Sequence, residues 1–418
     1  MVLVAVALVV TAHWYVWRRL VRDTTKPGGL GRRAGTAAIV VLPLLAVGAV
    51  TSSRAHTPFR VQQVLAWPGF LWLAVLLYLV LALAVGEAVR PLLRRWAEPR
   101  EAARDSAESA IEVNEPATVG AARTPAAPDS PAADRAATAP VPGTPSRRLF
   151  VSRVVGGAAA TAALATVGYG TYGVLRGPRI KRITVPLAKL PRSAHGFRIA
   201  VVSDIHLGPI LGRAHTQRIV DSLNSARPDL IAVVGDMVDG SVEDLGPAAE
   251  PLAGLEAPHG SFFVTGNHEY FSGAAAWVDH VRELGLRPLE NARVELPGFD
   301  LAGVNDIAGE SEGAGPDFAK ALGDRDRSRT SVLLAHQPVV IDDAVEHGVD
   351  LQLSGHTHGG QLWPGNLLAE LANPTVAGLE RYGDTQLYVS RGAGAWGPPV
   401  RVGAPSDITV VELASRQA

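Results

Sequence analysis

Long apolar segments fill the first part of the chain, and short apolar runs fill the second. Before residue 178, four segments contain a single charged residue, Glu87: Val2–Trp17, Thr36–Val50, Trp67–Val89 and Val154–Leu175. A helix needs about 20 apolar residues to cross a hydrocarbon core of ~30 Å. The pattern predicts three transmembrane helices in residues 1–96 and a fourth segment in residues 147–176. For the two shortest segments, which need flanking residues to span, the alternative is a signal-peptide core or a re-entrant segment.

The positions of lysine and arginine predict an orientation. Basic residues fill the connection after the first segment and the stretch after the third, whereas the second connection carries only Arg54 and Arg60. By the positive-inside rule the N-terminus then lies outside, and the fourth segment leads the chain out of the cytoplasm. We therefore predict a multi-pass protein of the cell membrane whose residues 177–418 are extracytoplasmic. Four basic residues beyond the exit oppose this orientation: Arg176, Arg179, Lys181 and Arg182.

Residues 97–146 are rich in alanine and proline and poor in large apolar side chains. Such a stretch cannot bury enough surface to offset the entropy of ordering, so we predict a disordered linker. The sequence Ser-Arg-Arg-Leu-Phe-Val follows at residues 146–151 and resembles a twin-arginine export signal, which makes the twin-arginine export machinery an expected partner. The alternative is that Arg147 and Arg148 only anchor the fourth segment on the cytoplasmic side.

From about residue 177 short apolar runs end in polar or glycine-rich turns, as strands of an α/β domain do. The predicted strands are Phe197–Ser203, Asp229–Val234, Ser261–Thr265, Phe299–Val304, Ser331–Ala335, Val349–Leu353, Leu387–Ser390 and Ile408–Leu413. Helices are predicted at Arg213–Ala226 and Ala274–Leu284. Strands that alternate with helices indicate α/β layering for residues 177–418.

The amino-acid composition excludes several kinds of functional site and partner. The chain has no cysteine, which excludes disulfides, zinc–thiolate sites, iron–sulfur clusters and thiol nucleophiles. Its net charge is −1, from 39 basic and 40 acidic residues, so no nucleic-acid partner is expected. A bound metal would have to be held by His, Asp, Glu or Asn.

Polar motifs stand directly after five of the predicted strands. They are Asp204-Ile-His206, Gly235-Asp236-Met-Val-Asp239, Gly266-Asn267-His268-Glu269, the single His336, and Gly355-His356-Thr-His358. The carboxyl ends of strands are where α/β sheets assemble their sites. Imidazole and carboxylate donors without thiolate suit Mn²⁺, Fe or Zn²⁺. Each motif alone is weak, but all five in order, each after a strand, predict a metal centre.

These motifs resemble those of the calcineurin-like metallophosphoesterase family over roughly residues 195–415, and Gly355–Gln361 with Leu387–Gly394 resemble its membrane-anchored or exported bacterial branch. The resemblance implies a sandwich of two mixed β-sheets flanked by helices, and two divalent metal ions (Mn²⁺, Fe or Zn²⁺). It also implies that His268 protonates the leaving oxygen and that Asp239 orients His268. The implied metal ligands are Asp204, His206 and His358 for one ion, Asn267, His336 and His356 for the other, and Asp236 between them.

The resemblance implies hydrolysis of a phosphoester by a metal-bridged hydroxide. Protein serine/threonine phosphatases of the family carry arginine where Gly240 and Thr265 stand here. We therefore expect a phosphodiester or pyrophosphate substrate, and the membrane region favours a phospholipid or a wall-linked compound. The alternatives are a phosphomonoesterase or nucleotidase, and a non-catalytic metal-binding scaffold. The complete set of ligand and acid residues disfavours the scaffold.

Other residues near the motifs have more than one interpretation. Arg391 and Arg401 could bind a phosphate group or form structural ion pairs. Asp306 could support the metal centre or close a turn. Trp363 and Trp396 could line a substrate groove, enter lipid, or simply pack.

Overall fold

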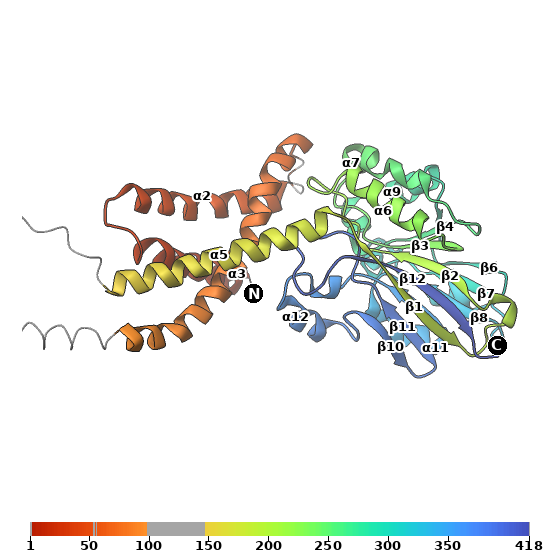
Figure 1. Ribbon diagram of the computed structural model, residues 1–418. Helices are drawn as coiled ribbons and strands as arrows, with labels where there is room; N and C mark the ends of the chain where they lie inside the picture. Colours follow the sequence, from red (N-terminus) through yellow and green to blue (C-terminus); the bar gives the residue numbers. More distant parts are fainter. Residues whose placement is uncertain (1, 53–54, 56, 98–146, 418) are drawn as a thin grey trace, which may run out of the picture. The chain divides into compact units, whose positions relative to one another are not determined.

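The computed structural model describes residues 2–52, 55, 57–97 and 147–417 (Figure 1). The linker predicted over residues 97–146 therefore lies outside the described residues, apart from its first residue. The described chain forms two compact units, Met1–Ile39 with Tyr78–Ala163, and Val40–Leu77 with Leu164–Ala418.

All the regular secondary structure described before residue 176 is helical. They are α1 (Val2–Val16), the π-helix η1 (Trp17–Arg22), α2 (Leu30–Ser52), α3 (Phe59–Ala97) and α5 (Arg147–Leu175). Among the described helices, three contain stretches long and apolar enough to cross a membrane: Leu30–Ser52, Phe59–Leu93 and Leu149–Leu175. The 15-residue α1 is not one of these three. The number of spans and the limits of the membrane region stay predictions.

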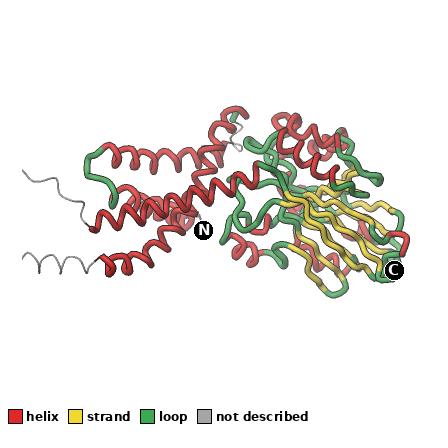
Figure 2. Tube along the Cα trace, viewed as in Figure 1, coloured by secondary structure: helices red, strands yellow, loops and turns green. Residues whose placement is uncertain are grey.

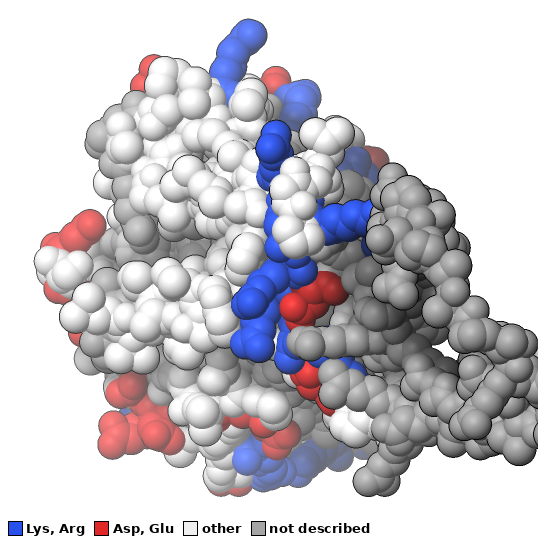
Figure 3. Space-filling view, turned by 90° about the vertical axis from the view of Figure 1, so that its left-hand side faces the viewer, with Lys and Arg blue, Asp and Glu red and all other residues white. Residues whose placement is uncertain are grey.

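Polar contacts tie the helices of the first unit together. The Trp17 indole donates to the Thr36 hydroxyl at 2.9 Å, and Arg19 forms an ion pair with Glu87, also at 2.9 Å. Gly86 approaches Val155 so closely that a Cβ there would lie 2.6 Å from a valine methyl. Figure 3 shows one face of the molecule, on which Lys and Arg side chains form a band beside a smaller group of carboxylates.

Two six-stranded sheets form the part of the second unit after residue 178 (Figure 2). The first sheet has the order β1-β12-β2-β3-β4-β5 and the second has the order β10-β11-β9-β8-β7-β6. The strands of the first sheet are β1 (Arg179–Leu187), β2 (Phe197–Val202), β3 (Leu230–Val234), β4 (Ser261–Val264), β5 (Arg287–Pro288) and β12 (Asp407–Ser415). Those of the second are β6 (Ala292–Leu296), β7 (Phe299–Gly303), β8 (Thr330–Leu334), β9 (Leu351–Ser354), β10 (Gly378–Tyr382) and β11 (Thr385–Val389).

Short helices connect these strands. The α-helices are α6 (Arg213–Ser225), α7 (Val242–Ala249), α8 (Asn267–Ser272), α9 (Ala274–Glu283), α10 (Phe318–Leu322), α11 (Ile341–Glu346) and α12 (Gly365–Ala372). The 3₁₀ helices are η2 (Arg192–Ala194), η3 (Glu250–Gly254), η4 (Ile307–Glu312), η5 (Pro338–Val340) and η6 (His358–Gly360).

The hydrophobic core lies between the sheets and beneath the helices that cover them. Phe262 of β4 and Phe299 of β7 are fully buried in the layer between the sheets. Each such side chain stabilises the fold by about 1.5–3 kcal/mol. Trp277 of α9 packs with α6 and α7 against the first sheet, and Phe318 of α10 packs with α11 against the second. The sandwich of two mixed sheets flanked by helices is thus confirmed (Figure 1).

The sheet topology explains why the motifs meet. β2, β3 and β4 run parallel to one another, as do β7, β8 and β9, so each set ends at one edge. All eight predicted strands and both predicted helices are present, with ends within about two residues of those expected. The five motifs therefore follow the carboxyl ends of β2, β3, β4, β8 and β9.

Candidate metal centre

The seven residues predicted as metal ligands lie together at the ends of these strands. Asp204, His206 and His358 offer ligand atoms that all lie within 4.8 Å of one another. Asp236, His336 and His356 form a second group by the same measure, and Asn267 joins it because its Oδ1 is 3.0 Å from Nδ1 of His356.

Asp236 stands between the two groups. Its Oδ2 is 3.1 Å from Nε2 of His336 in one group and 3.8 Å from Nε2 of His206 in the other. Its Oδ1 accepts a hydrogen bond from the backbone N–H of His268 at 2.9 Å, which fixes the carboxylate plane. One carboxylate in this position can contribute to both groups.

The donor atoms of the second group fit a bound cation. Nδ1 of His336 donates to the carbonyl of Val234 at 2.9 Å, so Nε2 of the neutral ring carries a lone pair. That buried Nε2 has no hydrogen-bond partner among the described residues, yet it faces the Asp236 carboxylate at 3.1 Å. Two lone pairs in this arrangement repel unless a proton or a metal ion lies nearby.

The electrostatics of the buried carboxylates also favour added positive charge. Burial raises the pKa of Asp204, and the negative charge of Asp236 adds to that effect. For Asp236 burial acts in the same direction, but His336 and His206 outweigh it and lower the pKa. Burial lowers and Asp236 raises the pKa of His336, and the carboxylates win, so its pKa lies well above the ordinary value. Buried carboxylates of this kind need paired charge or a metal.

A third group places an imidazole beside the centre. Asp239 Oδ1 lies 2.7 Å from Nδ1 of His268 and 2.9 Å from Nδ1 of His206. Despite burial, these two rings lower the pKa of Asp239 to about 2, so it is a carboxylate that accepts from both. Nε2 of His206 faces the first donor group, 3.0 Å from Nε2 of His358. The side chain of His268 is 14% exposed, which makes it reachable from solvent.

The backbone at the centre is strained. Five of the seven predicted ligands have positive φ values: Asp204, His206, Asp236, His356 and His358, at 51°, 50°, 52°, 71° and 54°. For a residue with a Cβ this left-handed conformation costs roughly 1–2 kcal/mol. Such residues cluster at functional sites, where the surrounding fold holds them in place.

Two glycines of the motifs allow the close approach of the carboxylates. A Cβ on Gly266 would lie 2.3 Å from Oδ1 of Asp236, and one on Gly355 would lie 2.5 Å from Oδ2 of Asp204. Neither distance is possible for a real side chain. The glycines in Gly-Asn-His-Glu and Gly-His-x-His are therefore needed for space as well as for the turns.

Glu269 supports the centre in a way that the sequence did not indicate. Its fully buried carboxylate accepts hydrogen bonds from the backbone N–H groups of Asp236 (2.9 Å), Met237 (2.8 Å) and Gly266 (2.6 Å). It thus joins the loop after β3 to the loop after β4. Burial and the charge of Asp236 raise its pKa to about 7.

Arg401 supports the centre through His358. Its buried guanidinium donates to Nδ1 and to the carbonyl of His358, both at 3.0 Å, and to the carbonyls of Gly394, Arg391 and Ala404. Burial, His206 and Arg401 together hold the pKa of His358 well below its ordinary value. A neutral imidazole is the form that binds metal.

The other candidates have simpler surroundings. Arg391 forms an ion pair with Asp407 at 3.8 Å, as the structural interpretation expects. Asp306 caps η4 by accepting from the N–H of Ala308 at 2.8 Å and also accepts from the Gln337 amide. Trp363 and Trp396 are both exposed, and the Trp396 ring lies 5.6 Å from the ring of His268.

Comparison with known proteins agrees with this geometry. A model of the calcineurin-like phosphoesterase family matches residues 197–360. The chain is 40% identical to an uncharacterized metallophosphoesterase of Helicobacter pylori over 256 residues, which are 60% of this chain and 68% of that protein. It is 38% identical to a zebrafish (Danio rerio) protein described as a transmembrane protein with metallophosphoesterase domain, over 60% of this chain and 61% of that protein. A solved dimetal phosphatase from Danio rerio is similar at 12% identity and a TM-score of 0.37, over 53% of this chain and 93% of that chain.

Proposed function

Because the chain belongs to the calcineurin-like metallophosphoesterase family and is a metal-dependent phosphoric ester hydrolase, we propose that it cleaves a phosphodiester or pyrophosphate bond in a membrane-associated substrate. The observation that carries this proposal is the pair of donor groups joined by Asp236, with His268 beside them. The family match covers the loops that hold both groups.

Two divalent ions are the proposed cofactors, and Mn²⁺, Fe and Zn²⁺ all suit the donors. In this proposal Asp236 serves both ions, and the remaining ligands divide as Asp204, His206 and His358 for one and Asn267, His336 and His356 for the other. When bound, two such ions neutralise phosphoryl oxygens and lower the pKa of a water molecule towards neutrality.

His268 is the proposed acid. Its Nδ1 contacts Asp239 at 2.7 Å, which fixes the ring and leaves Nε2 to give a proton to the departing oxygen. Because Asp239 also holds His206, one carboxylate sets the position of the acid relative to the first donor group.

The residues around His268 support a diester or pyrophosphate substrate. Neither of the two positions where family protein phosphatases carry arginine has a cationic side chain here, because they are Gly240 and Thr265. The carbonyl of Gly240 accepts from the Trp277 indole at 2.9 Å, and the Thr265 hydroxyl accepts from the N–H of Asp306 at 3.2 Å. The exposed rings of Phe271 and Trp396 flank His268 at 5.4 and 5.6 Å, where they offer apolar surface to an organic group on the leaving side.

The location of the enzyme is part of the proposal. Three helices of spanning length and a transmembrane relative support a multi-pass membrane protein, and the arginine pattern supports an extracytoplasmic catalytic domain. α12 begins five residues after η6 and exposes Leu367, Leu368 and Leu371 by 56, 72 and 84%. An apolar helix face so near a predicted metal ligand suits a phospholipid or wall-linked substrate that approaches along the bilayer.

Turnover by the full chain in detergent micelles tests the activity. With Mn²⁺ added, we expect cleavage of bis-p-nitrophenyl phosphate to exceed that of p-nitrophenyl phosphate. His268→Ala and Asp236→Asn should abolish it, while His280→Ala, at a surface position paired with Glu283, should not. A preference for the monoester would instead favour a phosphomonoesterase or nucleotidase. Bound metal without cleavage of either ester would favour the scaffold.

The topology needs its own measurement. We expect added protease to cleave residues 177–418 in cells whose outer envelope has been opened but whose cytoplasmic membrane is intact. Protection of that domain under these conditions would place it in the cytoplasm and contradict both the orientation and the use of the twin-arginine export machinery.

A further inference from the structure

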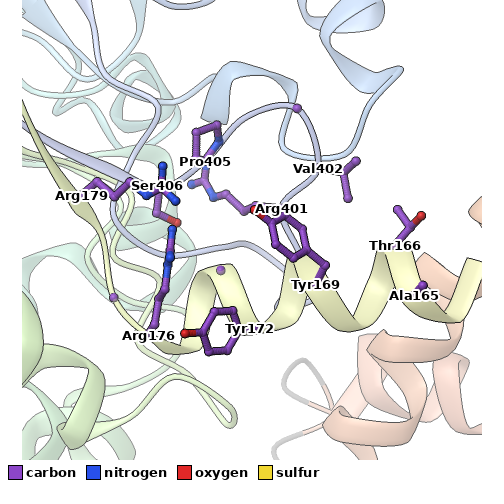
Figure 4. A pocket seen from close by; sticks show the side chains of 13 residues that line it. Ala165, Thr166, Tyr169, Tyr172, Arg176, Arg179, Arg401, Val402, Pro405 and Ser406 are labelled. Carbon is purple, nitrogen blue, oxygen red and sulfur yellow. The ribbon is translucent and has the colours of Figure 1, made fainter.

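A cavity of about 530 Å³ lies where α5 leads into the catalytic domain (Figure 4). One wall is the last part of α5 from Ala165 onward, with Arg176 directly after the helix, and the other is the loop from Arg401 to Ser406. None of the seven predicted metal ligands and neither His268 nor Asp239 lines it. The cavity is therefore a separate site from the metal centre.

The chemistry of the cavity suits an anion. Arg176 and Arg179 line it with exposed guanidinium groups, and neither forms an ion pair with a carboxylate in the described part of the chain. None of the described residues that line the cavity is acidic. The nearest acid along the loop, Asp407, is already engaged with Arg391 and with the Ser390 hydroxyl.

A buried hydroxyl in the same wall lacks a partner. Ser406 is only 5% exposed, and its Oγ has no hydrogen-bond partner among the described residues. A buried polar group without a partner costs about 1–3 kcal/mol, so an acceptor supplied by a ligand would remove a real penalty. In Figure 4 the side chain of Arg176, the residue directly after α5, points toward Ser406, which brings a cation and a free hydroxyl to one place.

The helix that forms the first wall indicates where the anion comes from. α5 is apolar along Leu149–Leu175, and the cavity follows its final turns past Ala165 and Thr166. Tyr169 and Tyr172 are exposed there, and the Arg176 guanidinium lies 5.6 Å from the Tyr172 ring. Tyrosine and arginine at the end of an apolar helix are typical of the interface between lipid tails and head groups, where basic residues contact lipid phosphates.

We propose that this cavity binds the head group of an anionic phospholipid. Arg176 and Arg179 bind the phosphate, the Ser406 hydroxyl donates to it, and the acyl chains lie along the apolar turns of α5. This goes beyond the proposed function, because the bound lipid is a ligand at a second site and need not be cleaved.

The cavity is linked to the metal centre through one residue. The N–H of Arg401 donates to the carbonyl of Gly170 in α5 at 3.3 Å, and a Cβ on Gly170 would lie 2.8 Å from the Arg401 carbonyl. The guanidinium of the same residue holds His358. A lipid seated between α5 and this loop would thus contact the segment that supports a predicted metal ligand.

Lipid binding to the delipidated full chain in detergent tests the proposal. Native mass spectrometry and thermal unfolding are measured with dioleoyl phosphatidylglycerol, with dioleoyl phosphatidylcholine, and with glycerol phosphate. Of these three compounds, we expect only phosphatidylglycerol to bind and to raise the melting temperature of the protein. The Arg176→Gln/Arg179→Gln double variant should bind it at least tenfold more weakly, and Ser406→Ala should also bind it more weakly. Arg182→Gln changes an exposed arginine of β1 outside the cavity and should bind as the wild type does.

Three results would overturn the proposal. Equal binding of both phospholipids would show that charge is not recognised. Unchanged binding of phosphatidylglycerol to the double variant and to Ser406→Ala would place the lipid elsewhere. Saturation by glycerol phosphate at the same affinity would identify a site for free phosphate compounds. Both measurements are made without turnover, so their results stand whether or not the proposed hydrolysis is found.

Discussion

Replacement of Arg401 by methionine tests the support of the metal centre most directly. Methionine keeps much of the length and apolar volume of the side chain and removes every donor. The change takes the Arg401 donor from five acceptors: Nδ1 of His358 and the carbonyls of His358, Arg391, Gly394 and Ala404. Of these, the His358 carbonyl keeps one donor, the N–H of Gln361 at 3.2 Å.

The size of the effect follows from those contacts. Each buried acceptor left without a donor costs about 1–3 kcal/mol. Because the His358 carbonyl keeps the Gln361 N–H and the 3.3 Å contact to Ala404 is weak, we count three full losses at the lower bound. We therefore expect a fall of about 3 kcal/mol in the free energy of unfolding. Loss of a residue that orients a metal ligand should also weaken metal binding about 10–100-fold.

Both quantities are measurable on the full chain in detergent. Denaturant unfolding gives the free energy, and Mn²⁺ competition with a fluorescent chelator gives the affinity. Arg391→Met is the matched control, because it removes a partly exposed arginine with one 3.8 Å ion pair and should cost less than about 1 kcal/mol. If Arg401→Met unfolds like the control and keeps wild-type metal affinity, Arg401 does not position His358 and the reasoning is wrong.

Three further predictions follow from other residues. Glu269→Gln leaves one acceptor for three backbone N–H groups and should cost about 2–4 kcal/mol in denaturant unfolding, whereas Glu283→Gln at the surface should be neutral within about 0.5 kcal/mol. Gly266→Ala should lower the bound metal measured by atomic absorption, since its methyl group would overlap Asp236; Gly212→Ala, with nothing within 4 Å, should leave it unchanged. Burial, Arg218 and Arg401 lower the pKa of His215 to about 4 from 6.5. The unfolded chain then takes up this proton first, so the folded state should lose up to about 3 kcal/mol as the pH falls from about 6.5 to 4. His215→Met should remove that part of the slope in unfolding measured at several pH values, and an unchanged slope would contradict the assignment.

The fold could be predicted where burial leaves a continuous apolar run. β2, β3, β4, β7 and β8 lie inside the sheets and consist mainly of apolar residues, which is why the sequence predicted them. β1 and β10 are edge strands that pair on one side only, and their exposed positions carry residues such as Arg179 and Glu380. An edge strand has no uniform pattern of this kind, so both were missed, as were the other two edge strands, β5 and β6.

The residues of the candidate site also differ in how well the sequence could predict their roles. The five motifs are local in sequence, since a strand end and its following loop supply all the donors of each motif. Glu269 belongs to a motif, but its role depends on N–H groups more than thirty residues earlier. Arg401 reaches His358 across 43 residues, and no short pattern marks it. Contacts between distant loops decide such roles, and only the folded chain brings those loops together.

The place of β12 between β1 and β2 has a consequence for how the protein is made. β1 follows α5 directly, yet its partner in the sheet begins 220 residues after β1 ends, at Asp407. At about 5–20 residues per second, the ribosome needs roughly 10–45 s to deliver that partner. During this time α5 has left the ribosome while the first sheet lacks the strand that joins β1 to β2. The apolar helix α5 is therefore available for membrane insertion before the domain that follows it can complete its first sheet. If the domain is exported folded, the cell must keep α5 out of the membrane until β12 has been made.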